Sequence, residues 1–292
     1  MKIEIKDLYK KYEDFYALED INLTLENGMY GLLGSNGAGK TTMMKIMAGI
    51  LRKSGGEISY DGKILKNIKE VRNRIGYIPQ SFSFYPDMTV YEIMDYFSVL
   101  NKIKKGRKEA IDELLEMVHL EDKSNFKTKA LSGGMKQRLG IAVALIGNPD
   151  LLLVDEPTVG LDPEERIHFS NILTEFSRNR TILLSSHIVS DIESTCKNLA
   201  ILDCGRLIYA GSKEKIIKSC CGKVWEVTVN GEDAKKMEKE FHVTHKKLYD
   251  DVTVLRVVSE QKPSNHAVEV EPDLNDAYIY AMNQEKAGNC NI

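Results

Sequence analysis

The sequence predicts an α/β domain followed by a small α+β domain. Short apolar strands alternate with helical segments up to about residue 212. A purely helical pattern interrupts this alternation over about residues 82–147, which predicts an inserted helical subdomain. We therefore expect a first domain at residues 1–212 and a second at 213–292. A length of 292 residues agrees with two domains of about 150 residues each.

Two apolar patterns predict the strands of the first domain. Ile3 and Ile5 alternate with charged residues, which is typical of a half-buried strand. Continuous apolar runs at 29–33 and 151–154 predict strands that are buried on both faces. Further strands are expected at 21–25, 57–60, 75–78, 181–185, 199–202 and 206–209.

Helical spacing marks the inserted subdomain, and a mixed pattern marks the second domain. One helix face is predicted to carry Ile93, Tyr96, Phe97 and Leu100, and another to carry Ile111, Leu114, Leu115 and Val118. The second domain is expected to contain a strand around 225–229, a helix at 233–241, a strand at 252–258, a loop at 262–270 and a helix at 274–282.

Composition excludes several classes of protein. The formal charge of −3 and the hydrophobic content of 42% are ordinary for a globular chain, and they argue against a disordered protein or a dedicated nucleic-acid binder. The longest apolar runs, 141–146 and 277–282, are far shorter than the roughly 20 residues of a membrane span. Five cysteines lack CxxC spacing and predict free thiols. We therefore expect a cytoplasmic protein without nucleic-acid partners.

The strongest motif is GSNGAGKT, which follows the expected strand 29–33 and precedes a helical segment. It matches GxxxxGK[ST], in which backbone N–H groups and a helix N-terminus surround a phosphate. Lys40 would bridge the β- and γ-phosphates, and the Thr41 hydroxyl would ligate Mg²⁺. The predicted phosphate-binding residues are Gly34, Ser35, Asn36, Gly37, Ala38, Gly39, Lys40, Thr41 and Thr42.

A second motif places two carboxylates at the end of a buried strand. Asp155 and Glu156 follow the apolar run 151–154. Asp155 would hold Mg²⁺ through water, and Glu156 would polarise the attacking water. Because successive residues of a strand point to opposite sides, the two carboxylates would flank the γ-phosphate.

The segment LSGGM at 131–135, about twenty residues before Asp155, resembles the signature of the ATP-binding cassette (ABC) family. This resemblance implies a P-loop NTPase cassette in which Ser132, Gly133 and Gly134 contact the γ-phosphate of ATP bound to a partner copy. Met135 departs from the usual Gln. We expect this change to be tolerated, because the preceding three residues supply the phosphate donors.

Further residues match the family in order along the chain. Gln80 resembles the glutamine that senses Mg²⁺ and faces the membrane partner. Gly160, Leu161 and Asp162 resemble the loop that crosses the dimer interface. His187 resembles the histidine that contacts the γ-phosphate. The resemblance thus implies that Glu156, His187, Lys40 and Gln80 are catalytic, and that Thr41, Gln80 and Asp155 hold the metal.

The family also stacks adenine on an aromatic side chain upstream of the phosphate loop. Tyr12 lies where this platform is expected, and Phe15 and Tyr16 are close alternatives. Stacking on any of them would contribute about 1–3 kcal/mol. We expect Tyr12 to be the platform.

Within the family, the spelling LSGGMKQR, the single cassette and the segment EPDLNDA at 271–277 resemble the branch that exports drugs, bacteriocins and sodium. This resemblance implies a multi-span permease as a separate chain, a homodimer or heterodimer of ATPase subunits, and peripheral attachment to the cytoplasmic membrane face. The alternatives are an ABC ATPase that acts on ribosomes or DNA, and a regulatory module. His242 and His245 suggest no metal site, because no completing ligands are apparent.

Overall fold

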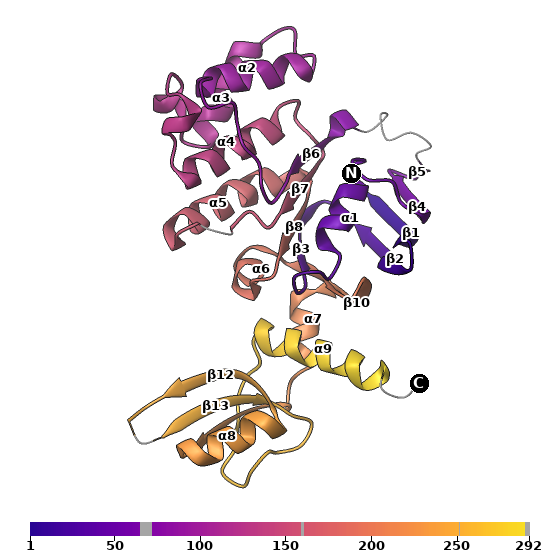
Figure 1. Ribbon diagram of the computed structural model, residues 1–292, viewed down its shortest axis with the longest axis vertical. Helices are drawn as coiled ribbons and strands as arrows, with labels where there is room; N and C mark the ends of the chain where they lie inside the picture. The colour runs from indigo at the N-terminus through magenta and orange to yellow at the C-terminus, as the bar shows by residue number, and fades with distance from the viewer. Residues whose placement is uncertain (65–71, 159–160, 251, 290–292) are drawn as a thin grey trace. The chain divides into compact units, whose positions relative to one another are not determined.

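The computed structural model describes residues 1–64, 72–158, 161–250 and 252–289 (Figure 1). It divides into two compact units, Met1–His187 with Leu202–Leu207, and Ile188–Ile201 with Ile208–Ile292. Strands β9 (Asn198–Asp203) and β10 (Arg206–Ser212) each cross this division. The division at residue 212 that the sequence suggests stays a prediction.

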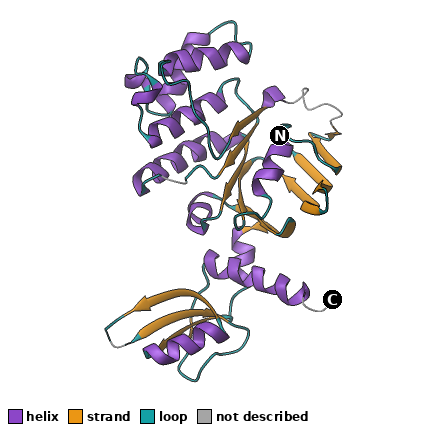
Figure 2. Cartoon of the chain, in the orientation of Figure 1, coloured by secondary structure: helices purple, strands orange, loops and turns teal. Residues whose placement is uncertain are grey.

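The first unit is built around a parallel sheet (Figure 2). Its strands lie in the order β3-β8-β7-β6 and pair in parallel. All five residues of β7 are buried, which explains its uninterrupted apolar sequence. The predicted α/β fold is confirmed. The bounds are β3 Gly28–Leu33, β6 Ile75–Ile78, β7 Leu151–Asp155 and β8 Thr181–Ser186.

An antiparallel sheet of order β2-β1-β4-β5 completes the core of this unit. Helix α1 (Lys40–Met47) contacts both β7 and β2, so it lies between the two sheets (Figure 1). Helix α5 (Pro163–Phe176), which the sequence analysis did not predict, also belongs to this unit. The strand bounds are β1 Ile3–Tyr12, β2 Phe15–Leu25, β4 Gly55–Tyr60 and β5 Lys63–Ile64.

The inserted subdomain consists of helices α2 (Val90–Leu100), α3 (Arg107–Met117) and α4 (Gly133–Leu145), which contact one another. The predicted apolar face of the first helix is only partly right, because Tyr96 and Leu100 are exposed. The residues of α2 that face the core follow the spacing i, i+3, i+4, i+8, and they are Val90, Ile93, Met94 and Ser98.

The second unit contains an antiparallel sheet of order β12-β13-β11-β14. Apolar residues of α8 pack with Val227, Leu255 and Val257 on one face. Arg256 lies between two of these residues in β13, so it points to the other face, where it binds α9. The bounds are α6 Val189–Thr195, α7 Lys213–Lys218, β11 Val224–Val229, α8 Gly231–Glu240, β12 His242–Leu248, β13 Thr253–Val258, β14 Val268–Glu269 and α9 Leu274–Asn289.

Three elements of this unit depart from the sequence analysis. Strand β14 lies inside the expected loop at 262–270, because it is a two-residue pairing with β11. Strand β12 was not predicted, because its sequence HVTHKKL is mostly polar and exposed. Helix α6 was also missed.

Within the described residues, no helix combines the length and apolar character that crossing a membrane requires.

Candidate functional site

The glycine-rich segment forms a loop between β3 and α1, as its sequence predicts. Gly39 has a φ of 107°, and a Cβ atom there would lie 2.7 Å from the Ala17 carbonyl oxygen. Both the backbone conformation and the close approach therefore require glycine. The Lys40 ammonium donates hydrogen bonds to the carbonyl oxygens of Gly34, at 2.7 Å, and Ser35, at 3.0 Å. The loop therefore curls around a buried lysine.

One carboxylate gathers three of the predicted catalytic side chains. Glu156 Oε1 lies 3.0 Å from Lys40 Nζ, and both side chains are almost fully buried. Glu156 Oε2 accepts a hydrogen bond from Gln80 Nε2 at 3.2 Å and lies 3.1 Å from His187 Nδ1. Residues from four separate segments of the chain thus converge at the carboxyl ends of β6, β7 and β8, where parallel α/β sheets bind ligands.

The second carboxylate, Asp155, is fully buried and is contacted on both oxygens. Oδ1 accepts hydrogen bonds from Ser185 Oγ at 2.7 Å and Thr41 Oγ1 at 3.2 Å. The Tyr77 hydroxyl lies 3.5 Å from Oδ2, and burial together with the Asp155 charge raises the pKa of this phenol. A hydroxyl and a carboxylate side by side are the oxygen ligands that Mg²⁺ prefers, so these residues fit a magnesium ion.

The two adjacent carboxylates contact different groups, and the backbone leaves the strand conformation between them. Strand β7 ends at Asp155, and Glu156 has a φ of 46°, in the left-handed region that non-glycine residues rarely adopt. Its N–H donates to the Ser185 carbonyl oxygen at 3.2 Å and to Ser185 Oγ at 3.0 Å. The expected strand alternation therefore does not apply to this pair, because Glu156 lies just beyond the strand in a left-handed conformation that Ser185 holds.

A pocket of about 400 Å³ opens over the loop, within the usual range for small-molecule sites. Tyr12 and Phe15 both line it, whereas Tyr16 lines a different hollow together with Tyr9. The Lys10 ammonium lies 4.6 Å from the centroid of the Tyr12 ring. Of the three candidate platforms for adenine, Tyr12 and Phe15 therefore line the pocket and Tyr16 does not. The pocket lining is Tyr12, Phe15, Ala17, Asn36, Gly37, Gly39, Lys40, Thr41, Thr42, Gln80 and Glu156.

The signature residues do not line this pocket. Ser132 is the N-cap of α4, and its hydroxyl accepts a hydrogen bond from the Met135 N–H at 3.1 Å. Asp162 caps α5 in the same way, through the Glu165 N–H at 2.9 Å. Leu161 is buried, and the expectation for Gly160 lies outside the described residues.

Sequence reasoning missed two residues that contact Asp155, namely Tyr77 and Ser185. The register of β7 and β8 pairs Asp155 with Ser185, and β6 places Tyr77 beside Leu153. The sequence does not reveal which strands are neighbours in a parallel sheet or how they are aligned. The one available signal is that a hydroxyl residue precedes His187 by two positions on a predicted strand.

The site combines a strand, a glycine-rich loop, a buried lysine and two carboxylates at a strand end. This combination defines a nucleotide-binding ATPase of the P-loop class. Residues 18–159 match the family described as ABC transporter. The chain is 36% identical over 227 residues to the Nod factor export ATP-binding protein I of Cupriavidus pinatubonensis. The alignment covers 75% of this chain and 69% of that protein. The chain belongs to the ABC transporter family.

Two more comparisons agree with this assignment. The methionine import ATP-binding protein MetN 2 of Bacillus cereus is 38% identical over 222 residues, covering 72% of this chain and 66% of that protein. A dimeric ATP-binding cassette in a post-hydrolysis state with ADP and Pi matches with a TM-score of 0.65 and 25% identity, over 72% of this chain and 98% of that one. The chain is an ATP-binding, ATP-hydrolysing ABC subunit with ATP and Mg²⁺ as cofactors.

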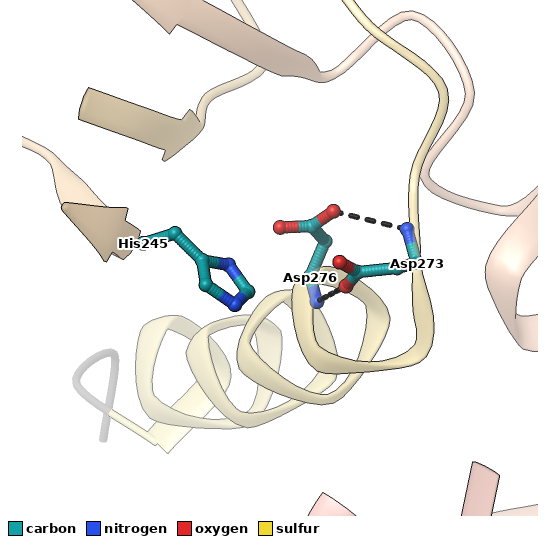
Figure 3. Close-up of side chains that lie close together, drawn as sticks. All are labelled: His245, Asp273 and Asp276. Atoms are coloured by element: carbon teal, nitrogen blue, oxygen red, sulfur yellow. Dashed lines mark hydrogen bonds between the residues drawn. The ribbon is translucent and has the colours of Figure 1, made fainter. Parts of the chain in front are cut away.

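The second unit holds a cluster that the sequence analysis did not expect. Ligand atoms of His245, Asp273 and Asp276 lie within 4.8 Å of one another (Figure 3). Asp276 Oδ2 accepts a hydrogen bond from Arg256 at 2.7 Å, and Thr244 donates to Oδ1 at 2.7 Å. The backbone N–H groups of Asp273 and Asp276 each donate to the other's carboxylate, which is a capping box for α9. The completing carboxylates are therefore present, but an arginine neutralises the buried one.

We expect Asp276→Asn to destabilise the protein by on the order of 3 kcal/mol at neutral pH, because it leaves the Arg256 guanidinium without its buried partner. Burial alone would raise the pKa of the Asp276 carboxyl, but Arg256 and the Asp273 N–H hold this pKa below its ordinary value. The stabilisation is therefore complete above the ordinary pKa of about 4 and is lost as pH falls through the lower value of the folded protein.

Urea unfolding at neutral and at acidic pH measures this effect. The midpoints of the wild type and of Asp276→Asn should differ at neutral pH and converge once the carboxyl is protonated. A constant difference across the whole pH range would contradict the ionic role.

Proposed function

We propose that this chain is the ATPase subunit of an exporter, that it acts as a dimer on the cytoplasmic membrane face, and that a separate multi-span subunit carries the substrate. The observation that carries the ATPase part is the convergence of Lys40, Gln80 and His187 on the Glu156 carboxylate, beside the Thr41 and Asp155 pair. Relatives of both export and import type match the chain, and the signature spelling together with the EPDLNDA segment favours export.

The proposed roles follow from the contacts. The loop N–H groups and Lys40 bind the β- and γ-phosphates, and Tyr12, with Phe15 beside it, stacks on adenine. Thr41, Asp155 and Gln80 hold Mg²⁺, which neutralises phosphate charge when bound. Glu156 accepts the proton of the attacking water, and His187 contacts the γ-phosphate.

Each site is proposed to be completed by a second copy of the cassette. Ser132 lies at the N-terminus of α4, where a hydroxyl and backbone N–H groups favour an anion. Ser132, Gly133 and Gly134 do not line the pocket of their own chain. Ser132 and Gly133 are exposed, and the segment is proposed to contact the γ-phosphate bound by the partner. Two ATP molecules then join two copies, and their hydrolysis removes the bridge.

The membrane subunit is proposed to dock in an apolar groove next to Gln80. The groove has a volume of about 230 Å³ and lies between the segment after β6 and helices α2 and α4. The Phe82 ring packs on Gly140, and Tyr85 is 61% exposed at the rim. The groove is lined by Tyr77, Ile78, Pro79, Phe82, Ser83, Phe84, Tyr85, Ile93, Phe97, Gly140 and Val143.

Co-expression with the membrane subunit tests this docking. We expect Tyr85→Ala to lower the stimulation of ATPase activity by that subunit several-fold, while the basal activity and ATP affinity of the isolated chain stay unchanged. Ile50→Ala, which removes an equally exposed apolar side chain outside the groove, is the matched control. Full ATPase activity in a membrane-free, ribosome-dependent assay would instead support the alternative function, an ABC ATPase that acts on ribosomes.

A further inference from the structure

We propose that Ser185 is a positioning residue for ATP hydrolysis, and that its single buried hydroxyl orients both the metal-binding Asp155 and the general base Glu156. This inference rests on the roles proposed above for those two residues. Ser185 belongs to β8 and is fully buried.

The hydroxyl of Ser185 contacts both acidic residues at the same time. It donates to Asp155 Oδ1 at 2.7 Å, the shortest hydrogen bond that this carboxylate makes among the described residues. It also accepts from the Glu156 N–H at 3.0 Å. A hydroxyl has one donor and two acceptor positions, so it can serve both partners together. The register that pairs Asp155 with Ser185 brings the three groups together.

The other contacts of Asp155 are weaker substitutes. Thr41 Oγ1 lies at 3.2 Å from Oδ1, and this hydroxyl is itself a proposed metal ligand. The Tyr77 hydroxyl lies at 3.5 Å from Oδ2, the limit of a hydrogen bond. Ser185 is therefore the neighbour best placed to keep the carboxylate in one orientation.

The second contact supports a strained piece of backbone. Glu156 has a φ of 46°, a conformation that persists only where the surroundings hold it. The Ser185 hydroxyl and carbonyl oxygens are the two acceptors of its N–H. Because the direction of the Glu156 side chain depends on this turn, loss of the hydroxyl should disturb the base as well as the metal ligand.

The test compares Ser185→Ala, Ser185→Thr and Thr181→Val. Thr181 is the matched control, because it is a fully buried hydroxyl residue at the other end of β8. Its one hydroxyl proton is shared between the carbonyl oxygens of Met1, at 2.9 Å, and Glu26, at 3.0 Å. Mn²⁺ affinity is measured by electron paramagnetic resonance in the full chain loaded with a non-hydrolysable ATP analogue. Nucleotide affinity in EDTA, kcat and thermal unfolding are measured in parallel.

We expect Ser185→Ala to weaken Mn²⁺ binding about tenfold or more, as the loss of a hydrogen bond to a charged group implies, and to lower kcat. Nucleotide affinity in EDTA should stay unchanged. Ser185→Thr keeps the hydroxyl and should recover most of the Mn²⁺ affinity. Thr181→Val should lower thermal stability without changing Mn²⁺ affinity.

Two results would overturn the positioning role. One is wild-type Mn²⁺ affinity in Ser185→Ala, whatever its kcat, and the other is an equal loss of Mn²⁺ affinity in Thr181→Val, which would indicate general destabilisation. Asp155→Asn separates the two levels of the proposal. If it weakens Mn²⁺ binding while Ser185→Ala does not, only the role of Ser185 is wrong. If it also leaves Mn²⁺ binding unchanged, the proposed metal site is wrong as well.

Discussion

Glu156→Gln should lower ATP turnover by about 10²- to 10⁴-fold, the usual contribution of a general base, while ATP binding persists. The amide has the size of the carboxylate but cannot accept the proton of the attacking water. It also removes the charge of the ion pair at 3.0 Å, so Lys40 keeps its bonds to the loop carbonyl oxygens but no longer has a competing carboxylate. Single-turnover hydrolysis and equilibrium binding of labelled ATP measure the two properties separately.

Asp155→Asn is the matched control for this variant, because it makes the same chemical change one residue away. It should weaken Mg²⁺ dependence and nucleotide binding together, since it changes the charge around the metal. Wild-type turnover in Glu156→Gln would contradict the base assignment and make His187 the leading alternative. Equal loss of binding in both variants would indicate that the two carboxylates only support the phosphate loop.

Lys40→Ala should weaken ATP binding by one to two orders of magnitude, because it removes a charged hydrogen bond worth about 1.5–3 kcal/mol. The structure adds a second consequence. Glu156, which is 6% exposed, loses its cation, and breaking a buried ion pair costs about 3–5 kcal/mol of stability. The variant should therefore unfold at a lower denaturant concentration than the wild type, even without nucleotide.

The double variant Lys40→Ala/Glu156→Gln separates these two effects. It removes the unpaired charge, so it should regain stability relative to Lys40→Ala, yet it should still bind ATP weakly. Urea unfolding and nucleotide titration on the same preparations give both numbers. Unchanged ATP affinity in Lys40→Ala would contradict the phosphate-loop assignment, and equal stability of the single and double variants would contradict the importance of the ion pair.

Much of the fold was predictable because its elements carry local signals. The run 151–154 is apolar throughout, since both faces of β7 are covered, and GSNGAGKT needs its glycines for the geometry of the loop. The resemblance to the ABC family implied that Lys40, Gln80 and Glu156 belong to one site. In the structure, Lys40 and Gln80 each contact the Glu156 carboxylate.

The remaining features depend on alignment between distant segments, which no local pattern records. Ser185 reaches Asp155 only through the register of two parallel strands. Tyr96 fits a helical apolar stripe, yet it lies outside the face that α2 buries. In the structure, the carboxylates of Asp273 and Asp276 lie near His245, because a polar edge strand, β12, pairs with β13 and lies against α9.

The central claim is that ATP joins two copies of this chain, each site being completed by the Ser132 segment of the other copy. The most direct measurement is the mass in solution of Glu156→Gln with Mg²⁺ and ATP, together with the number of nucleotides bound per chain. The account predicts a species of twice the 33.0 kDa of one chain that carries two ATP molecules and reverts to single chains when ATP is removed. A stable ATP-bound species with the mass of one chain would contradict it.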